Sequence, residues 1–287
     1  MKTKRAETDF TADSLPHTRP QVFWDCIRIR HRLLFACGGL LLAFALPLVA
    51  LLLTRDAVLA SIAADVGIAD SDKLRQMFYA DIIFHLGYIV GYALLGLGLA
   101  GTARVIRQLA WAEGVFLRRD FTDGVRLNGG VYVIVFVLLG AVRLVCAVMD
   151  QATANDIVWA AVKYMPSVTA VVLLAPIALL VLNQAAVYQS KVLKLCKNAT
   201  LMYFRTLPTT FVATLCALLP YAGTMLLESF PVPVYAKPLF VALYVCVLLP
   251  FTQLGEFLYC SSLFDKFINH TSHPQMVDKG VWRKPQA

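Results

Sequence analysis

Glu256 is the side chain whose type and position could best carry chemistry, because it is an acid inside the last long apolar stretch of the chain. A carboxylate within a membrane span is costly and is a functional hypothesis by default. On a helix it shares a polar stripe with Thr252, Gln253 and Cys260. Glu256 lies about 17 residues, roughly 26 Å, from the outer end of its stretch, so it reaches toward the inner interface. We therefore expect a structural role, capping or pairing with an inner-loop Arg or Lys, and keep a binding site as the alternative.

Arg143 is a charge in the outer third of another apolar stretch. It can snorkel outward or form an ion pair, and we expect the ion pair. The acids within reach are Asp81, Asp150 and Glu228. Two amides lie at a level similar to Glu256 on a third stretch and could share a network with it, namely Asn183 and Gln184.

Motifs for catalysis, cofactors and metals are absent from the sequence. It contains no G-x-x-x-x-G-K-[ST] loop, no H-E-x-x-H pair and no G-x-S-x-G elbow. The five histidines are scattered, and the seven cysteines include no C-x-x-C pair. We therefore expect a protein that is not an enzyme, with no catalytic, cofactor-binding or metal site and no disulfide framework.

Long apolar stretches must position these residues. The chain is 59 % hydrophobic and 15 % charged, and its apolar residues fall in blocks of about 20, the length that crosses a bilayer as a helix. Six such blocks are predicted, at 33–53, 82–103, 131–149, 168–187, 211–227 and 239–263. We expect one all-α domain, 1–287, a polytopic membrane helical bundle with a basic cytoplasmic arm at 1–32 and a cytoplasmic tail at 264–287.

The basic residues give the bundle a direction. With both termini inside, 20 of the 26 Lys and Arg residues lie on the inner side, as the positive-inside rule requires. We therefore predict a multi-pass protein of the cell membrane with cytoplasmic N- and C-termini. The net charge of +8 is explained by membrane lipid as the partner rather than nucleic acid.

Two further patterns concern packing and the inner loops. Four glycines fall on one face of the second stretch, where another helix can approach closely: Gly87, Gly91, Gly98 and Gly101. The approaching helix belongs to the same bundle or to a partner, so a homo-oligomer stays open. The inner loops, 104–127 and 188–208, mix basic and aromatic residues and could each form an amphipathic helix on the cytoplasmic face.

Several segments resemble the YesL family of bacterial membrane proteins, which carries a domain of unknown function. Residues 96–128 resemble a recurrent family segment in which small residues precede an Arg, an acid and an aromatic-Asp-Phe core. The matching positions are Gly98, Gly101, Arg107, Glu113, Asp120 and Phe121. The second inner loop is similar through Lys197 and Asn198, and the tail through its Ile-Asn and Lys-Gly pairs.

The resemblance implies an accessory role, because family members tend to occur beside carbohydrate uptake systems of the ABC type. It implies permease or ATPase subunits as partners and carries over no catalytic residue. A non-catalytic accessory or regulatory membrane protein is therefore the leading hypothesis.

Two alternatives remain. One is a stand-alone transporter or channel for a small solute, which requires polar residues near mid-membrane. The other is a membrane enzyme acting on lipid or glycan, with Glu113, Asp120 and Asp123 as its only candidate acids. Because arginines are interleaved with those acids, at Arg118, Arg119 and Arg126, we expect internal ion pairs there instead.

Overall fold

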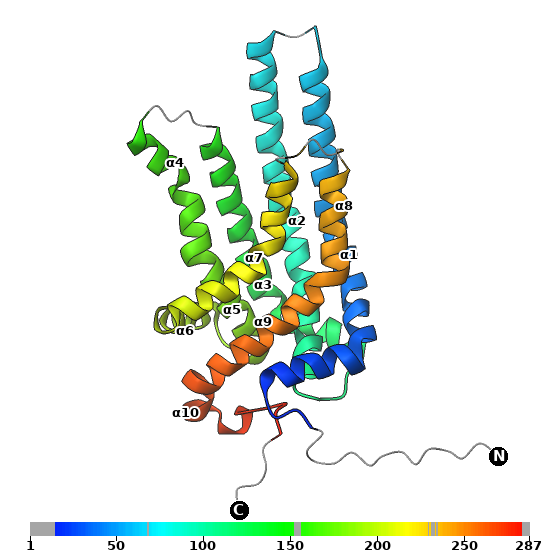
Figure 1. Ribbon diagram of the computed structural model, residues 1–287, viewed down its shortest axis with the longest axis vertical. Helices are drawn as coiled ribbons and strands as arrows, with labels where there is room; N and C mark the ends of the chain where they lie inside the picture. The colour runs from blue at the N-terminus through cyan, green and yellow to red at the C-terminus, as the bar shows by residue number, and fades with distance from the viewer. Residues whose placement is uncertain are drawn as a thin grey trace, which may run out of the picture.

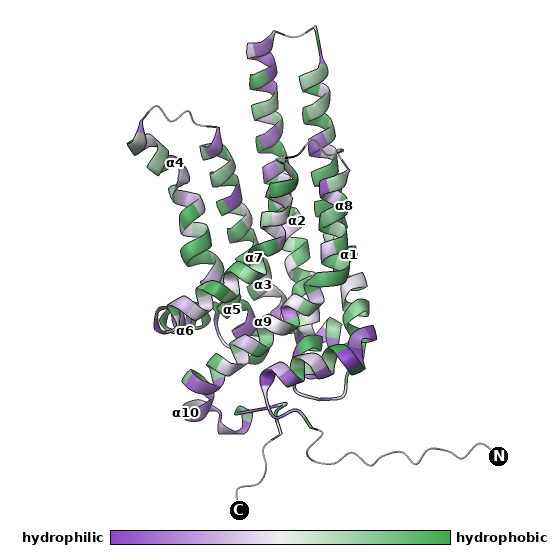
Figure 2. Ribbon diagram, in the orientation of Figure 1, coloured by the Kyte–Doolittle hydropathy of each residue, from purple (hydrophilic) through white to green (hydrophobic). Residues whose placement is uncertain are grey.

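A computed structural model describes residues 15–67, 69–151, 156–228, 230, 233 and 235–282, and within these ranges the regular structure is entirely helical. Five helices are long and apolar enough to cross a membrane, and a bent pair of helices makes a sixth possible span. The expected all-α bundle of about six spans is confirmed, and the chain is a multi-pass membrane protein (Figure 1). Apolar residues run along the upright helices in Figure 2.

The elements follow one another in a simple order. They are α1 (Arg19–Ala64), α2 (Asp70–Ala110), α3 (Leu117–Asp150), α4 (Ile157–Thr169), η2 (Ala170–Leu174), α5 (Ala175–Val187), α6 (Val192–Arg205), α7 (Leu207–Glu228), α8 (Ala236–Leu243), η3 (Tyr244–Leu248), α9 (Leu249–Phe264), η4 (Asp265–Asn269), α10 (His270–Ser272) and η5 (Pro274–Met276). The described chain begins and ends at the same end of the bundle, where the Trp282 backbone N–H donates to the Pro16 oxygen at 2.9 Å; we call this the terminal end (Figure 1). The opposite end, where α1 turns into α2, is called the hairpin end.

The predicted 1–32 arm is helical from Arg19 onward, where α1 begins. Thr18 caps it: the Thr18 side chain accepts from the Gln21 backbone N–H while the Gln21 side chain bonds back to the cap. The backbone leaves helical values at Arg30, with φ −119° and ψ 19°. This kink separates a short helix that crosses the terminal end from the upright part of α1 (Figure 1).

The hairpin of α1 and α2 is longer than predicted. The apolar blocks end near residue 53 and begin near residue 82, yet α1 continues to Ala64 and α2 begins at Asp70. Charged residues such as Arg55 and Lys73 end an apolar block without ending a helix. Asp70 also lies in the first turn of α2, where a negative charge stabilises the helix dipole.

Two upright helices are interrupted by π-helical segments that precede a proline. Segment η2 comes just before Pro176, and η3 comes just before Pro250. A proline lacks the N–H that would bond the carbonyl four residues earlier, and its ring displaces that carbonyl. The carbonyl that Pro176 leaves free is that of Val172, and the Tyr203 hydroxyl of α6 donates a hydrogen bond to it.

The two inner-loop predictions have different outcomes. No separate helix forms within 104–127: α2 simply continues to Ala110 and α3 starts at Leu117, with a tight turn between them. In 188–208 the predicted amphipathic helix is present as α6, which buries one face. Helix α7 then leaves α6 at an angle of 109°, so the predicted 211–227 block is part of a sharply bent pair.

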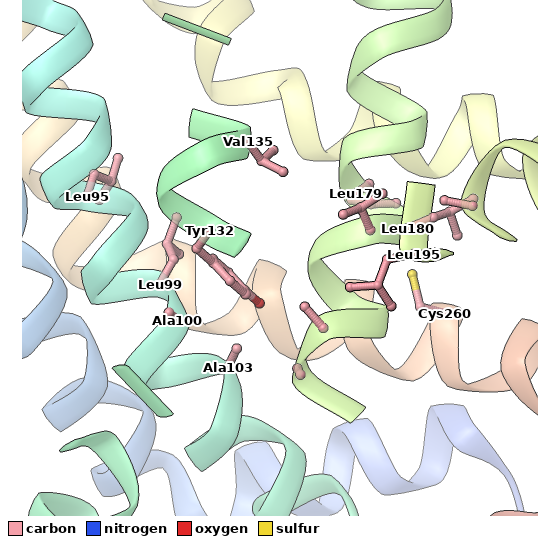
Figure 3. Close-up of a cluster of buried hydrophobic side chains, with 14 of the residues drawn as sticks. Leu95, Leu99, Ala100, Ala103, Tyr132, Val135, Leu179, Leu180, Leu195 and Cys260 are labelled. Atoms are coloured by element: carbon pink, nitrogen blue, oxygen red, sulfur yellow. The ribbon is translucent and has the colours of Figure 1, made fainter. Parts of the chain in front are cut away.

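The described residues form two buried hydrophobic clusters, and the larger draws on α1, α2, α3, α5, α6, η3 and α9. Figure 3 shows side chains of α2, α3, α5, α6 and α9 converging there, including Leu99, Tyr132, Leu180, Leu195 and Cys260. The Tyr132 hydroxyl donates to the backbone oxygen of Leu182 at 3.1 Å. This cluster fixes the helices that carry both polar regions described below.

The glycine stripe packs within the bundle. A methyl group on Gly87, Gly91 or Gly98 would meet Leu51, Leu48 or Phe44 of α1 at 2.9 to 3.4 Å. These three glycines therefore let α1 and α2 approach closely, as predicted. The fourth, Gly101, faces α3 instead, where an added methyl would lie 2.5 Å from the Phe121 ring.

Candidate functional site

Asp120 and Phe121, two of the residues matched in the first inner loop, lie at the turn between α2 and α3. Asp120 is 5 % exposed. One of its oxygens accepts from the Phe116 backbone N–H at 2.6 Å, and the other accepts from Gln108 Nε2 at 3.1 Å. Phe121 fills the space beside Gly101. Both residues are therefore engaged in building the turn.

Glu113 and Arg107 join this turn to segments far away in the sequence. Lys279 Nζ lies 2.7 Å from Glu113 Oε1 and 4.3 Å above the centre of the Trp111 ring. Arg107 donates to the backbone oxygen of Ala186 at 2.8 Å and stacks over the same indole ring at 5.0 Å. The predicted tail, 264–287, is thus packed against the bundle as far as the structure describes it.

Asp265 is the centre of a second buried network, at the terminal end. Its carboxylate bonds Arg19 NH2 at 2.6 Å, Asn269 Nδ2 at 2.7 Å and the Asp278 backbone N–H at 3.3 Å. Tyr188 donates its hydroxyl to Asn269 Oδ1 at 2.6 Å. Burial raises the pKa of Tyr188, so that the phenol stays a neutral donor.

An ion pair internal to the first inner loop, 104–127, is present, but its arginine is not one of the three expected. Asp123 lies 3.8 Å from Arg104 instead, and Glu113 pairs with Lys279 as described above. In the described ranges no ion pair joins these acids to the predicted partners, which are Arg118, Arg119 and Arg126. The three acids of the enzyme alternative are distributed over structural contacts and do not form one cluster.

Lys197 and Asn198 lie on α6 and are separate from these networks. Lys197 is exposed and Asn198 is half-buried. Their neighbours on the helix include three exposed apolar side chains: Leu193 at 85 %, Leu201 at 54 % and Phe204 at 60 % exposure. Helix α6 therefore presents a mixed basic and apolar surface.

The predicted polar stripe on α9 is divided between two faces. Gln253 turns toward α2, where Thr102 donates to its Oε1 at 2.9 Å and its Nε2 donates to the Leu99 oxygen at 3.2 Å. Glu256 lines a groove beside α7. The predicted network with the α5 amides is wrong, because Asn183 donates to Leu179 O and Gln184 to Met202 Sδ.

Arg143 lines a charged vestibule toward the hairpin end. This cavity has a volume of about 420 Å³ and is also lined by Arg55, Asp81, Asp150 and Lys237. Asp81, one expected partner of Arg143, bonds Arg55 Nε at 2.7 Å. Another, the Glu228 side chain, lies outside the described residues.

An apolar chamber of about 360 Å³ lies next to the vestibule and shares four lining residues with it, namely Arg55, His85, Arg143 and Lys237. Leucine, valine, phenylalanine and tyrosine side chains of α1, α2, α3, α7, α8, η3 and α9 line most of the chamber. The acids line the vestibule, whereas no acid is among the residues lining the chamber. The junction between the two is therefore lined by basic side chains.

Two buried polar atoms, one at this junction and one in the adjoining chamber wall, have no hydrogen-bond partner in the part of the chain that the structure describes. His85, 2 % exposed, donates from Nδ1 to the Asp81 oxygen at 2.8 Å, and its Nε2 has no partner. Tyr88, 5 % exposed, likewise has an unpartnered hydroxyl. Buried polar atoms are normally hydrogen-bonded, so such an exception calls for a ligand or an ordered water.

Sequence reasoning missed this junction. It treated His85 as one of several scattered histidines, although Asp81, His85 and Tyr88 have the spacing that puts three polar groups on one helix face. Three polar residues at this spacing within an apolar stretch would have indicated the junction from the sequence.

No family model, no curated protein and no solved structure matches this chain. Its function is therefore inferred from the chemistry of its own side chains.

Proposed function

We propose that the protein binds an anionic amphiphile, a molecule with a carboxylate or phosphate head and a hydrocarbon body, for passage through or release from the bundle. The observation that carries this proposal is the junction of the vestibule and the chamber. An anionic head at the junction would meet Arg143, Lys237 and Arg55, the last of which also bonds Asp56 and Asp81, and the body would occupy an apolar chamber. This is the transporter alternative, with the ligand class specified.

Binding of a dye-labelled long-chain carboxylate to the purified protein in nanodiscs tests the proposal. Lys237→Gln is expected to weaken binding by about tenfold or more, because a hydrogen bond to a charged group contributes about 1.5–3 kcal/mol. Lys163→Gln on α4 is the matched control, since Lys163 does not line the cavity. Equal binding of the uncharged methyl ester, or equal losses in the two variants, would rule out the basic junction as the site.

We also propose a location in the cell membrane with both termini in the cytoplasm, supported by the 20 basic residues on that side. Val66, 94 % exposed at the tip of the hairpin, and Ser272, at the terminal end, lie at opposite ends. In intact cells an impermeant maleimide should label Val66→Cys and spare Ser272→Cys, with both labelled after lysis. Labelling of the second variant alone would reverse the orientation.

A second candidate function is an accessory role beside an ABC-type carbohydrate importer. The observation that favours it is α6, whose exposed Leu193, Leu201 and Phe204 lie near Lys197 and offer a surface to a permease or ATPase subunit. Gentle purification of the tagged protein should then recover such subunits, and Leu193→Asp should reduce the recovery. Isolation of the protein alone, with sugar uptake unchanged by its deletion, would exclude this role.

A further inference from the structure

The groove that Glu256 lines is separate from the vestibule and the chamber. It has a volume of about 360 Å³ and lies between the first turns of α1, the middle of α7 and the start of α9. The side chains around it are mainly apolar, including Phe23, Ala217 and Phe251. Its polar side chains come from one face of α9: Thr252, Glu256 and Tyr259.

Within the described residues, Glu256 has no hydrogen-bond or ion-pair partner. No lysine, arginine or histidine lines the groove; the titratable groups that do are Cys216 of α7 and Tyr259 of α9. Three more titratable side chains lie close enough to interact with its charge: Tyr132 of α3, Tyr244 of η3 and Cys260 of α9. Tyrosine and cysteine side chains carry no positive charge, so none of these groups compensates a negative charge on Glu256.

An uncompensated carboxylate in an apolar membrane site has a high free energy, and protonation removes that cost. A structural ion pair, the role expected from the sequence, would require a cation in the groove. The groove therefore suits a carboxyl group that gains and loses a proton.

Hydroxyl groups connect this face of α9 to the bend between α6 and α7. The Tyr259 hydroxyl lies 2.9 Å from Thr210 Oγ1 and 3.3 Å from Thr209 Oγ1. Thr210 Oγ1 is in turn 2.8 Å from Thr206 Oγ1. Thr209 is exposed, so the chain of hydroxyls runs from the groove to the protein surface.

We propose that Glu256 is a proton-binding site within the membrane part of the protein, and that the hydroxyls of Tyr259, Thr210 and Thr209 form its proton path. On release, the O–H bond of the carboxylic acid breaks, and the proton passes through water in the groove to the Tyr259 hydroxyl and then by way of Thr209 to water at the surface. On binding, the proton returns by the same path. This inference is independent of the ligand proposed for the vestibule and chamber.

The first test is labelling by dicyclohexylcarbodiimide, an apolar reagent that converts a protonated carboxyl in an apolar site into a stable N-acylurea. Mass spectrometry of the protein in nanodiscs should find the adduct on Glu256 and show that it decreases as pH rises. Glu113, which pairs with Lys279, is the internal control and should stay unlabelled. An unlabelled Glu256 at low pH, or equal labelling of Glu113, would overturn the proposal.

Infrared difference spectra give a second test that does not depend on the reagent. Over a pH titration the protein should show a C=O stretch of a protonated carboxyl beyond those of its other acids, and Glu256→Gln should abolish this additional band. Tyr259→Phe should keep the band and slow its exchange in deuterated water, because it removes the hydroxyl next to both threonines. A band that survives in Glu256→Gln would refute the site, and unchanged exchange in Tyr259→Phe would refute the path.

Discussion

Gly38→Ala is expected to destabilise the protein by about 3 kcal/mol or more, the upper range for overpacking a tight interface. A methyl group at Gly38 would lie 1.8 Å from the backbone oxygen of Cys246 and 2.8 Å from its carbonyl carbon. These atoms belong to the backbone of η3 and cannot rotate away. The close approach follows from Pro250, which has no N–H to donate to the Cys246 carbonyl. That carbonyl therefore faces α1 instead.

The neighbouring glycine supplies the control. A methyl group on Gly39 would have no atom within 4 Å, and alanine is favoured over glycine inside a helix by about 1 kcal/mol. Thermal unfolding in detergent should therefore show a lower Tm for Gly38→Ala and an equal or higher Tm for Gly39→Ala. Equal Tm values for the two variants would show that α1 and η3 are not this close.

Asp265→Ala is expected to have the second large effect. It should lower the free energy of unfolding by about 3–5 kcal/mol, as breaking other largely buried ion pairs does. The substitution leaves the Arg19 guanidinium, whose side chain is 15 % exposed, without its carboxylate. It also removes an acceptor from Asn269 and from the Asp278 backbone N–H. The short first segment of α1 should then detach from the terminal end.

Asp70→Ala is the matched control, because the Asp70 side chain is 98 % exposed and its nearest cation, Lys73, is 3.8 Å away. Such surface pairs contribute about 0–1 kcal/mol. Limited proteolysis between residues 19 and 30 should accelerate in Asp265→Ala and not in Asp70→Ala. Unchanged cleavage and unchanged Tm in Asp265→Ala would contradict the network.

The spans could be predicted because a bilayer imposes a length, and apolar blocks of that length are visible in the sequence. The ends of the helices could not be predicted in this way, because the apolar block stops at Arg55 and Asp56 while the helix continues to Ala64. The bend between α6 and α7 also escaped prediction, because the change of direction near Thr206 follows from how both helices pack.

The polar sites were predicted less well because they depend on contacts between distant segments. Gln253 and Glu256 are about 60° apart on a helix, so periodicity alone places them together. Packing then separates them: Gln253 bonds Thr102, which is 151 residues away, and Glu256 faces α7. The partner of Arg19 lies 246 residues along the chain, a distance over which local patterns carry no information.

The hairpin of α1 and α2 is longer than a membrane span. Helix α2 has 41 residues, about 62 Å at 1.5 Å per residue, against about 30 Å of hydrocarbon. At the base of the projecting part, Arg55 of α1 bonds Asp81 of α2 at 2.7 Å and also lines the cavity junction. Because Arg55 belongs both to this ion pair and to the lining of the cavity junction, the projecting hairpin is joined directly to the rim of the vestibule.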